Sequence, residues 1–476
     1  MKKNSAAPLL ELSSGLTAGI FIPLGQIPLN FWPLSLLGFA LLYYRLQSFN
    51  KWLTFCTVAG FSIAYFISGQ LWIFNSLYLG NSHSTEELVS GALMLFIVPA
   101  CICTFIMGLY PACCQLMNVQ RFTVASSILF SALWGLFELI YALIPPSFPL
   151  LISGYAVLGH LWDPVLPILG VLGSGFLLVL LSCLFAASFY ALLNRKRAKF
   201  YWLLPCLIIM LLSTFCLPDT EWTRRYDNRV FHYRLQINSN PDKPDSFFTD
   251  TSNPIPRLII LGGVDADAHR PYLLQKLPDL SNNKDSAFLV LMPRPEHCPD
   301  VFCSIGEGEG CSLEKLRTHK PAVNMQNCNL SRLPIKKSAF ARHPSVDSNR
   351  LLVMNNGTDG LPFLAIDTVS GSEIIVAFDI PYRGHVIRER LLHADRARAL
   401  ETGRPVVRYS NQGVSAEINH MGIIEGRFLP EQDRVDGELT PMVGKTPFMY
   451  LGRYAFLALL ATIFIAFAYR RLFQSL

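Results

Sequence analysis

RARALETGRPVVRYSNQGVSAEINHMG, residues Arg396–Gly422, carries the signals of a helix, two strands and two turns in one run. Apolar side chains recur at near-helical spacing from Leu391 to Ala397, and Gly403 with Pro405 ends that helix. The elements that follow are a strand starting at Val406–Val407, a turn at 411–413, a strand at Val414–Ile418 and a turn at 419–422. The stretch therefore predicts a mixed α/β domain.

The composition of the whole chain indicates a membrane protein. Of its 476 residues, 51% are hydrophobic and only 16% are charged, with a mean hydropathy of +0.34, whereas globular domains average about 25% charged residues. Acidic residues are nearly absent from Leu9 to Trp202 and are concentrated from Glu221 to Lys445, so we expect a membrane part and a water-facing part. The net charge of +6 does not indicate nucleic-acid binding, because the Lys and Arg residues lie in short loops beside apolar segments.

Eight apolar segments have the length of a membrane span. They lie at 9–26, 30–47, 53–75, 89–116, 123–144, 165–193, 200–217 and 449–468. Pro23, Pro28 and Pro33 interrupt the first two, which we therefore expect to form a short hairpin. The basic N-terminus is expected to be an uncleaved anchor, since further spans follow it.

The distribution of positive charge predicts the orientation. The basic residues at the ends of the apolar segments and in the short loops between them all lie on one side: Lys2, Lys3, Arg45, Lys51, Arg121, Arg195–Arg197, Lys199, Arg470 and Arg471. The loops at 76–88 and 145–164 contain no Lys or Arg. The positive-inside rule then places both termini in the cytoplasm. The predicted domains are a membrane domain at 1–217, an external domain at 218–447, and a closing helix with a cytoplasmic tail at 448–476.

The external domain alternates strand and helix signals, which is typical of layered α/β folds. Strands are predicted at 257–261, Ala287–Met292, Leu361–Ile366 and Glu373–Phe378, and a helix at Tyr272–Leu280. Four of the 12 cysteines lie here, at Cys298, Cys303, Cys311 and Cys328. An oxidising compartment would allow one or two disulfides among them. A zinc site is less favoured, because no CxxC pair is present.

Glu138 is an acid in the middle of a predicted span. Such a residue is costly and suggests a functional site by default, but no basic partner is near in sequence, so we favour a carboxyl group hydrogen-bonded to a neighbouring helix. Trp72, Trp134 and Trp162 are expected to be interfacial anchors.

Several stretches resemble the apolipoprotein N-acyltransferases. The RARALETGRPVVR segment is similar to that family's RAIETGRPVVR segment. GIFIPLGQIPLNFWPLSLLGFALL (19–42) resembles its first hairpin, and GFSIAYFISGQLWIFNSL (60–77) resembles its third span. ALWGLFELIYALIPPSFPLLISGYAVLG (132–159) resembles its Trp…Glu…Phe-Pro-Trp…Gly-Tyr stretch, with Leu150 in place of the last Trp of Phe-Pro-Trp, and GKTPFMYLGRY (444–454) also fits.

This resemblance implies a fold and an activity. The fold is a polytopic α-helical membrane protein of about eight spans with an extracytoplasmic nitrilase-like αββα sandwich. The family transfers an acyl chain from a phospholipid donor to the N-terminal amine of a diacylated apolipoprotein, without a cofactor or metal. It implies a multi-pass protein of the bacterial inner membrane, with its soluble domain in the periplasm and no nucleic-acid partner.

The same resemblance implies a Cys nucleophile, a Glu base and a Lys that stabilises the developing oxyanion. The family's Ile-Cys-Tyr-Glu motif follows a buried strand, and an ungapped match places Ala377 at the nucleophile, followed by Phe378 and Asp379. An alanine has no nucleophilic atom, and no Cys lies downstream of Cys328.

The other two catalytic positions are matched only in part. The Trp-Pro-Glu motif aligns with Met292-Pro293-Arg294, which puts Arg294 at the base position, and a two-residue slip would offer Glu296 instead. The Lys motif aligns with LPIKKSAFARHPSVDS (333–348), where Lys337 is the better match. The alternative for both is a surface role. The family also has a strand and an Asn-Asp-x-Trp-Phe loop between the nucleophile strand and the RARALETGR helix, and no room for them is evident after Ile380.

Two functions remain open. One is an acyltransferase with a relocated nucleophile, for which Cys298 beside Glu296 and His297 is the candidate, although a disulfide is the simpler role for this cysteine. The other is a non-catalytic paralogue that binds lipoprotein or phospholipid, or scaffolds a partner. On residue chemistry, we expect the acyl-enzyme step to be impaired or absent.

Overall fold

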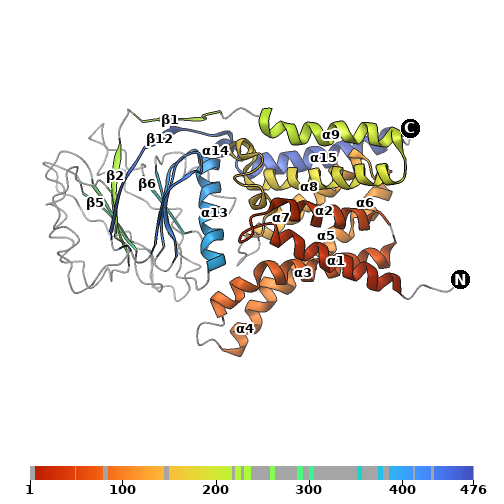
Figure 1. Cartoon of the computed structure of the whole chain (residues 1–476), viewed down its shortest axis with the longest axis horizontal. Coiled ribbons are helices and arrows are strands. Elements are labelled where there is room, and N and C mark those ends of the chain that lie inside the picture. The colour runs from red at the N-terminus through yellow and green to blue at the C-terminus, as the bar shows by residue number, and fades with distance from the viewer. Residues whose placement is uncertain are drawn as a thin grey trace. The chain divides into compact units, whose positions relative to one another are not determined.

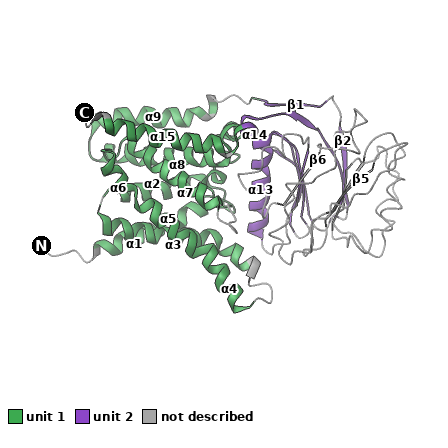
Figure 2. Cartoon of the chain, turned by 180° about the vertical axis from the view of Figure 1, so that it is seen from behind, with its two compact units in different colours: residues 1–220, 451–476 green, residues 221–450 purple. Residues whose placement is uncertain are grey.

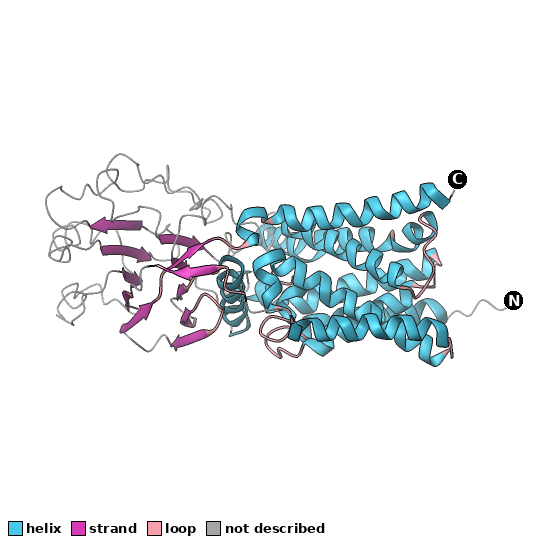
Figure 3. Cartoon of the chain, turned by 90° about the horizontal axis from the view of Figure 1, so that it is seen from above, coloured by secondary structure: helices cyan, strands magenta, loops and turns pink. Residues whose placement is uncertain are grey.

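The structure is a computed structural model that describes residues 6–48, 50–78, 84–143, 150–216, 220–226, 230–236, 258–262, 287–292, 300–304, 351–355, 374–378, 385–410, 413–429, 432 and 434–474. The chain divides into two compact units (Figure 2). Unit 1 comprises Met1–Thr220 and Leu451–Leu476, and unit 2 comprises Glu221–Tyr450. The described parts of unit 1 are almost entirely helical, whereas the described strands lie in unit 2 (Figure 3).

Unit 1 is a bundle of helices (Figure 1). They are α1 (Ala6–Leu24), α2 (Trp32–Leu46), α3 (Lys51–Tyr78), α4 (Thr85–Ala92), a π-helix (Leu93–Ile97), α5 (Val98–Gly108), α6 (Tyr110–Leu116), α7 (Val124–Leu143), α8 (Leu166–Leu193), α9 (Arg197–Cys216) and α15 (Arg453–Gln474). Two short 3-10 helices, Ser153–Ala156 and Asp163–Val165, lie between α7 and α8.

Six stretches of the described helices are long and apolar enough to cross a membrane. They are Ala7–Leu24, Lys51–Asn75, Thr85–Leu116, Val124–Leu143, Asp163–Leu193 and Tyr454–Leu472. The other two predicted spans correspond to α2, which has 15 residues, and α9, which has 20. A total of eight spans therefore stays a prediction. The expected N-terminal hairpin is present as α1 and α2, which are joined by a turn at 25–31.

Aromatic side chains fill the core of unit 1. Trp134 is fully buried and its ring packs edge-on against Phe39, Phe61 and Tyr65. Trp162 is also buried, and its indole nitrogen donates to the Ser213 hydroxyl at 3.0 Å. The prediction that these two tryptophans are interfacial anchors is wrong, because both face the interior of the bundle.

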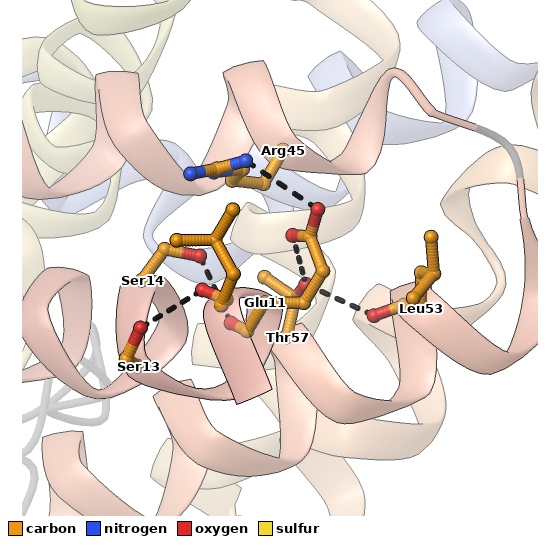
Figure 4. Close-up of polar contacts among 7 residues, drawn as sticks. Glu11, Ser13, Ser14, Arg45, Leu53 and Thr57 are labelled. Carbon is orange, nitrogen blue, oxygen red and sulfur yellow. Dashed lines mark hydrogen bonds and ion pairs between the residues drawn. The ribbon is translucent and has the colours of Figure 1, made fainter. Parts of the chain in front are cut away.

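The first three helices are joined by a polar contact (Figure 4). The Glu11 carboxylate of α1 lies 3.4 Å from Arg45 Nη1 of α2 and accepts a 3.0 Å hydrogen bond from the Thr57 hydroxyl of α3. One turn further along α1, a β-carbon at Gly15 would overlap the Thr57 carbonyl oxygen. The helices therefore approach closely enough for one carboxylate to hold both neighbours.

Unit 2 contains two five-stranded sheets and a small two-stranded one. The first sheet has the order β10 (Ile424–Phe428), β9 (Ser415–Ile418), β8 (Val406–Tyr409), β7 (Ile374–Phe378) and β6 (Leu351–Asn355). The second has the order β11 (Arg434–Leu439), β2 (Phe231–Gln236), β3 (Leu258–Gly262), β4 (Ala287–Met292) and β5 (Asp300–Ser304). The third pairs β1 (Thr223–Arg225) with β12 (Met442–Gly444), and α14 (Pro447–Leu451) follows.

The opening stretch of the sequence forms the predicted helix, both predicted strands and the turn at 419–422, whereas residues 411–412 of the other predicted turn lie outside the described residues. Helix α13 (His385–Thr402) ends before Gly403, which has φ +60°, and β8, β9 and β10 follow it. The turn before β10 is closed by Gly422, which donates to the Asn419 carbonyl at 2.9 Å and has φ +71°. The predicted strands at 257–261, 287–292 and 373–378 are confirmed as β3, β4 and β7. The predicted strand at 361–366 and helix at 272–280 lie outside the described residues.

Within unit 2, α13 covers one face of the first sheet, and the second sheet lies against the opposite face (Figure 1). Leu392 and Ala399 of α13 pack with Ile375, Val406 and Ile418 of the sheet in one apolar core. Strands β6, β7 and β8 are parallel. The connection from β7 to β8 passes through α13, which is the usual crossover between parallel strands.

We expect removal of the Glu11 charge to loosen the contact between the first three helices. Glu11→Gln takes the ionic partner from Arg45 and should lower unfolding stability by about 1 kcal/mol, the scale of polar contacts between membrane helices. Thermal unfolding of the full chain in detergent would measure this. Glu86→Gln on α4, where the glutamate is exposed, is the matched control. Equal unfolding midpoints for Glu11→Gln and the wild type would contradict the proposed role of the contact.

Candidate functional site

The position matched to the nucleophile, Ala377, lies inside β7 and is fully buried. Its side chain shares the apolar core between the sheet and α13 with Leu392 and Ala399. Because alternate residues of a strand face opposite sides, Ile375 and Ala377 both point toward α13. Position 377 is thus a core position covered by a helix, and a side chain there has no path to solvent.

A buried ion pair lies beside Ala377. In the pairing of β7 with β8, Ala377 is opposite Arg408. The Arg408 guanidinium contacts the Asp395 carboxylate of α13 at 2.5 Å, and its Nε donates to the Val414 carbonyl at 3.1 Å. Both charged side chains are fully buried. The pair therefore joins the helix to the sheet at the strand position next to Ala377.

The C-terminal turns of α13 hold a second group of buried polar residues. Arg398 and Glu401 form an ion pair, and neither side chain is exposed. The Thr446 hydroxyl donates to the Glu401 carbonyl at 2.6 Å, and the Thr223 hydroxyl donates to the Gly403 carbonyl at 3.0 Å. Arg404 donates to the Gly444 carbonyl at 2.6 Å. The two threonine bonds satisfy carbonyls that the end of α13 leaves without partners. With the Arg404 bond, they connect the end of α13 to β1 and β12.

A hydrogen bond connects the two large sheets. The Tyr233 hydroxyl of β2 donates to Glu417 Oε2 of β9 at 2.7 Å. Burial raises the pKa of the Glu417 carboxyl above its ordinary value, the Tyr233 hydrogen bond opposes this, and Glu425 and Glu438 add to it. Burial, and next the Glu417 charge, raise the pKa of Tyr233 as well. Since β9 alternates, its Ala416 and Ile418 face α13 while Glu417 faces the second sheet.

The remaining predicted site residues lie outside the described parts of the chain. These are Lys337, Glu296 and Arg294, together with Cys298, Cys311 and Cys328. Of the predicted disulfide cysteines, Cys303 lies in a described strand, β5, where it is opposite Phe288 of β4. The structure therefore places Ala377, whereas the predicted base and lysine lie outside the described residues.

The described residues show a further strand that the sequence did not predict. β6 runs parallel to β7 at the edge away from β8, with Met354 opposite Ala377. β7 itself leads to α13 and then to β8. The sheet thus has two parallel strands before α13, and the strand predicted at 361–366, which falls between them in sequence, lies outside the described residues.

The polar contacts of this region were not predicted either. Asp395 and Arg408 are 13 residues apart and Tyr233 and Glu417 are 184 apart, so neither pair is visible as a local motif. An arginine inside the Val-Val-Arg-Tyr strand was the one available signal, because a charge on a buried strand needs a partner. Among the described residues, no three His, Cys, Asp or Glu side chains are grouped so that they could hold a metal ion.

Comparison with known proteins finds similarity to one family. A family model described as the apolipoprotein N-acyltransferase N-terminal domain matches residues 18–184. Proteins named apolipoprotein N-acyltransferase align with almost the whole chain. The one from Pseudomonas paraeruginosa is 23% identical over 492 aligned residues, which cover 91% of this chain and 91% of the relative. The chain is similar to apolipoprotein N-acyltransferases over about nine-tenths of its length.

Two other relatives give the same result. The Azotobacter vinelandii protein is 25% identical over 493 residues, covering 91% of this chain and 90% of the relative. The Haemophilus influenzae protein is 22% identical over 513 residues, covering 95% and 92%. Both are named apolipoprotein N-acyltransferase. Among the described residues, six helices could cross a membrane, so the chain is a polytopic membrane protein that resembles these acyltransferases.

We expect Asp395→Asn to destabilise unit 2 strongly. The substitution removes the carboxylate that balances the buried Arg408 charge, and breaking a buried pair in this way costs about 3–5 kcal/mol. Thermal unfolding of the full chain in detergent would measure the loss. The double variant Asp395→Leu/Arg408→Met removes both charges and should recover much of the stability. If the double variant were as unstable as Asp395→Asn, packing rather than the uncompensated charge would be the cause.

The raised pKa of Glu417 predicts a pH dependence of stability. In the window between its ordinary and its raised pKa, the folded state holds the proton that the unfolded state has lost, so stability falls as pH rises. Glu417→Gln should remove this fall, so that its stability relative to the wild type increases as the pH rises through that window. Tyr233→Phe removes the bond that favours the charged carboxylate and should steepen the fall. Unfolding midpoints that change with pH identically in all three proteins would contradict the assignment.

Proposed function

We propose that this chain is an apolipoprotein N-acyltransferase-like protein that engages phospholipid and diacylated lipoprotein, and whose cysteine-based acyl-enzyme step is impaired or absent. The alignment with named acyltransferases over about nine-tenths of the chain supports the substrates. The observation that carries the second half is that no cysteine follows Cys328, so that neither β6 nor β7 supplies a thiol, and Ala377 of β7 is buried under α13.

The proposed topology follows the charge distribution. Eight spans, with α2 and α9 included, place both termini in the cytoplasm, since the basic residues lie in alternate loops. Unit 2 is then a periplasmic domain of a bacterial inner-membrane protein. Two facing sheets with α13 on the outer face of one of them are consistent with a nitrilase-like αββα sandwich. The proposed domains at 1–217, 218–447 and 448–476 have boundaries within a few residues of the two compact units.

The order of strands bears on which one would carry the nucleophile. By resemblance, a strand and a cleft loop separate the nucleophile strand from the RARALETGR helix. β7 leads directly to α13 and so occupies the place of that intervening strand, and β6, its parallel neighbour, occupies the place of the nucleophile strand. We infer that the equivalent position lies in or just after Leu351–Asn355 rather than at Ala377.

Both alignments lead to the same chemistry. Leu351–Asn355 reads Leu-Leu-Val-Met-Asn, and no cysteine occurs anywhere after Cys328. A thioester intermediate needs a thiolate, so neither strand supplies one. Lys337 and Glu296 remain the proposed oxyanion-stabilising residue and base, with Arg294 in the ungapped base position.

A relocated thiol is the competing possibility within the same family. Cys298 follows Glu296 and His297 in sequence, which are the residue types that activate a thiol. If Cys298 carries the acyl group, the chain is an active acyltransferase. If no residue does, it is a non-catalytic paralogue that binds lipid or lipoprotein or scaffolds a partner.

An acyl-enzyme trap tests the proposal. Purified full-length protein is incubated with phospholipid, digested and searched by mass spectrometry for a thioester-linked acyl chain. We expect retained phospholipid and no adduct in the wild type. Ala377→Cys should also give none, because a thiol buried under α13 has a raised pKa and no access to substrate. Labelling of this variant by a maleimide reagent, before and after denaturation, would verify that the thiol is shielded.

Three results would overturn the proposal in whole or in part. An adduct on the wild type that Cys298→Ala abolishes would establish a relocated nucleophile. A strong adduct at position 377 of the Ala377→Cys variant would show that the ungapped alignment is right and that the rest of the site is intact. Absence of both the adduct and bound phospholipid would remove the lipid-binding half of the proposal.

A further inference from the structure

Between α7 and α8, residues Leu150–Leu158 are buried although they form no α-helix. α7 ends at Leu143, and from Leu150 to Leu158 every residue is buried. Apart from the single 3-10 turn Ser153–Ala156, this part has no regular structure. Exposure returns at Gly159 and His160. A surface loop between two spans would show the opposite pattern, since loops normally keep their backbone in water.

The segment Leu150–Ala156 lies beside α7 at the level of Glu138, and not past the C-terminal end of the helix. The Ser153 backbone N–H donates to Glu138 Oε1 at 2.6 Å. Glu138 precedes Leu143 by five residues, which corresponds to roughly 7.5 Å along a helix. On the other side, Gly154 packs against the Val171 carbonyl of α8, and a β-carbon at Gly175 would lie 2.6 Å from the Ser153 hydroxyl. This segment therefore lies between α7 and α8, and not outside the ends of these helices.

Side chains of the surrounding elements satisfy the backbone of this segment. The Tyr65 hydroxyl of α3 donates to the Leu151 carbonyl at 2.7 Å. Gln26, in the turn after α1, donates from its amide nitrogen to the Leu151 and Ile152 carbonyls at 3.2 Å each. Glu138, Gln26 and Tyr65 are themselves buried. Non-helical backbone at membrane depth is tolerated only when protein or enclosed water provides such partners.

We propose that Leu150–Ala156 is a re-entrant segment of the membrane unit, and that Glu138 is the residue that positions it. The bond to Ser153, the first residue of a 3-10 helix, gives this intramembrane acid the kind of structural hydrogen bond that the sequence analysis favoured. The role does not depend on acyl transfer. In this role the Glu138 carboxylate accepts the hydrogen bond of the buried Ser153 backbone amide.

Hydrogen–deuterium exchange of the full chain in phospholipid nanodiscs tests the proposal. In the wild type, peptides covering 150–157 should exchange far more slowly than those covering the exposed residues 159–160. Glu138→Leu removes the acceptor of the Ser153 amide and should speed exchange there about tenfold or more. Glu138→Gln keeps a carbonyl oxygen in the same place and should retain most of the protection. Glu86→Leu, at an exposed acid on α4, is the control and should leave 150–157 unchanged.

A second measurement keeps the test decisive if Glu138→Leu does not fold. Ser153→Cys keeps the backbone N–H, and its thiol should resist a membrane-impermeant maleimide that labels His160→Cys readily. Slow labelling at 153 with fast labelling at 160 supports the re-entrant segment. Equal labelling at both positions, rapid exchange of 150–157 in the wild type, or unchanged exchange in a folded Glu138→Leu variant would each overturn it.

Discussion

The contact between Asp395 and Arg408 is the interaction on which the arrangement of unit 2 depends. It joins α13 to β8 across an otherwise apolar layer, and both charges are fully buried. Each charge is tolerable there only because the other is in place. The position of α13 in turn determines whether Ala377 is buried or accessible to a substrate. With the helix fixed over β7, the strand residue beneath it becomes part of the core and not part of a cleft.

The same requirement, that a polar group removed from water must find a partner, governs unit 1. Glu11 holds Arg45 and Thr57 of the two neighbouring helices, and Glu138 holds the backbone of a non-helical segment. In both units these contacts join different elements of the fold. They select one packing of the elements, whereas the apolar contacts around them would permit several.

The sequence was sufficient where the signal was local. The run from Arg396 to Gly422 contains its own helix stop and turn residues, and the structure has the predicted helix and strands in the predicted order. It was insufficient where the outcome depended on distant contacts. Tryptophan is a residue type typical of interfacial anchors, but Trp134 is buried, because three aromatic rings from α2 and α3 pack against it. β6 was not predicted from the sequence, and its parallel pairing with β7 is seen only in the structure. The candidate lysine and base could be named only from resemblance, since no local pattern fixes where they lie.

The pairing of β1 with β12 has a consequence for how the chain is made. Thr223 pairs with Gly444, and β2 pairs with β11, so the first strands of unit 2 wait for partners synthesised about two hundred residues later. Such pairings of high sequence separation form slowly. During this interval β2 has an open edge, on which another chain could pair. The ribosome completes unit 2 and α15 almost together, because α15 begins fewer than ten residues after β12 ends. Closure of the β-sheets and insertion of the last membrane helix are therefore nearly simultaneous events in the biogenesis of this protein.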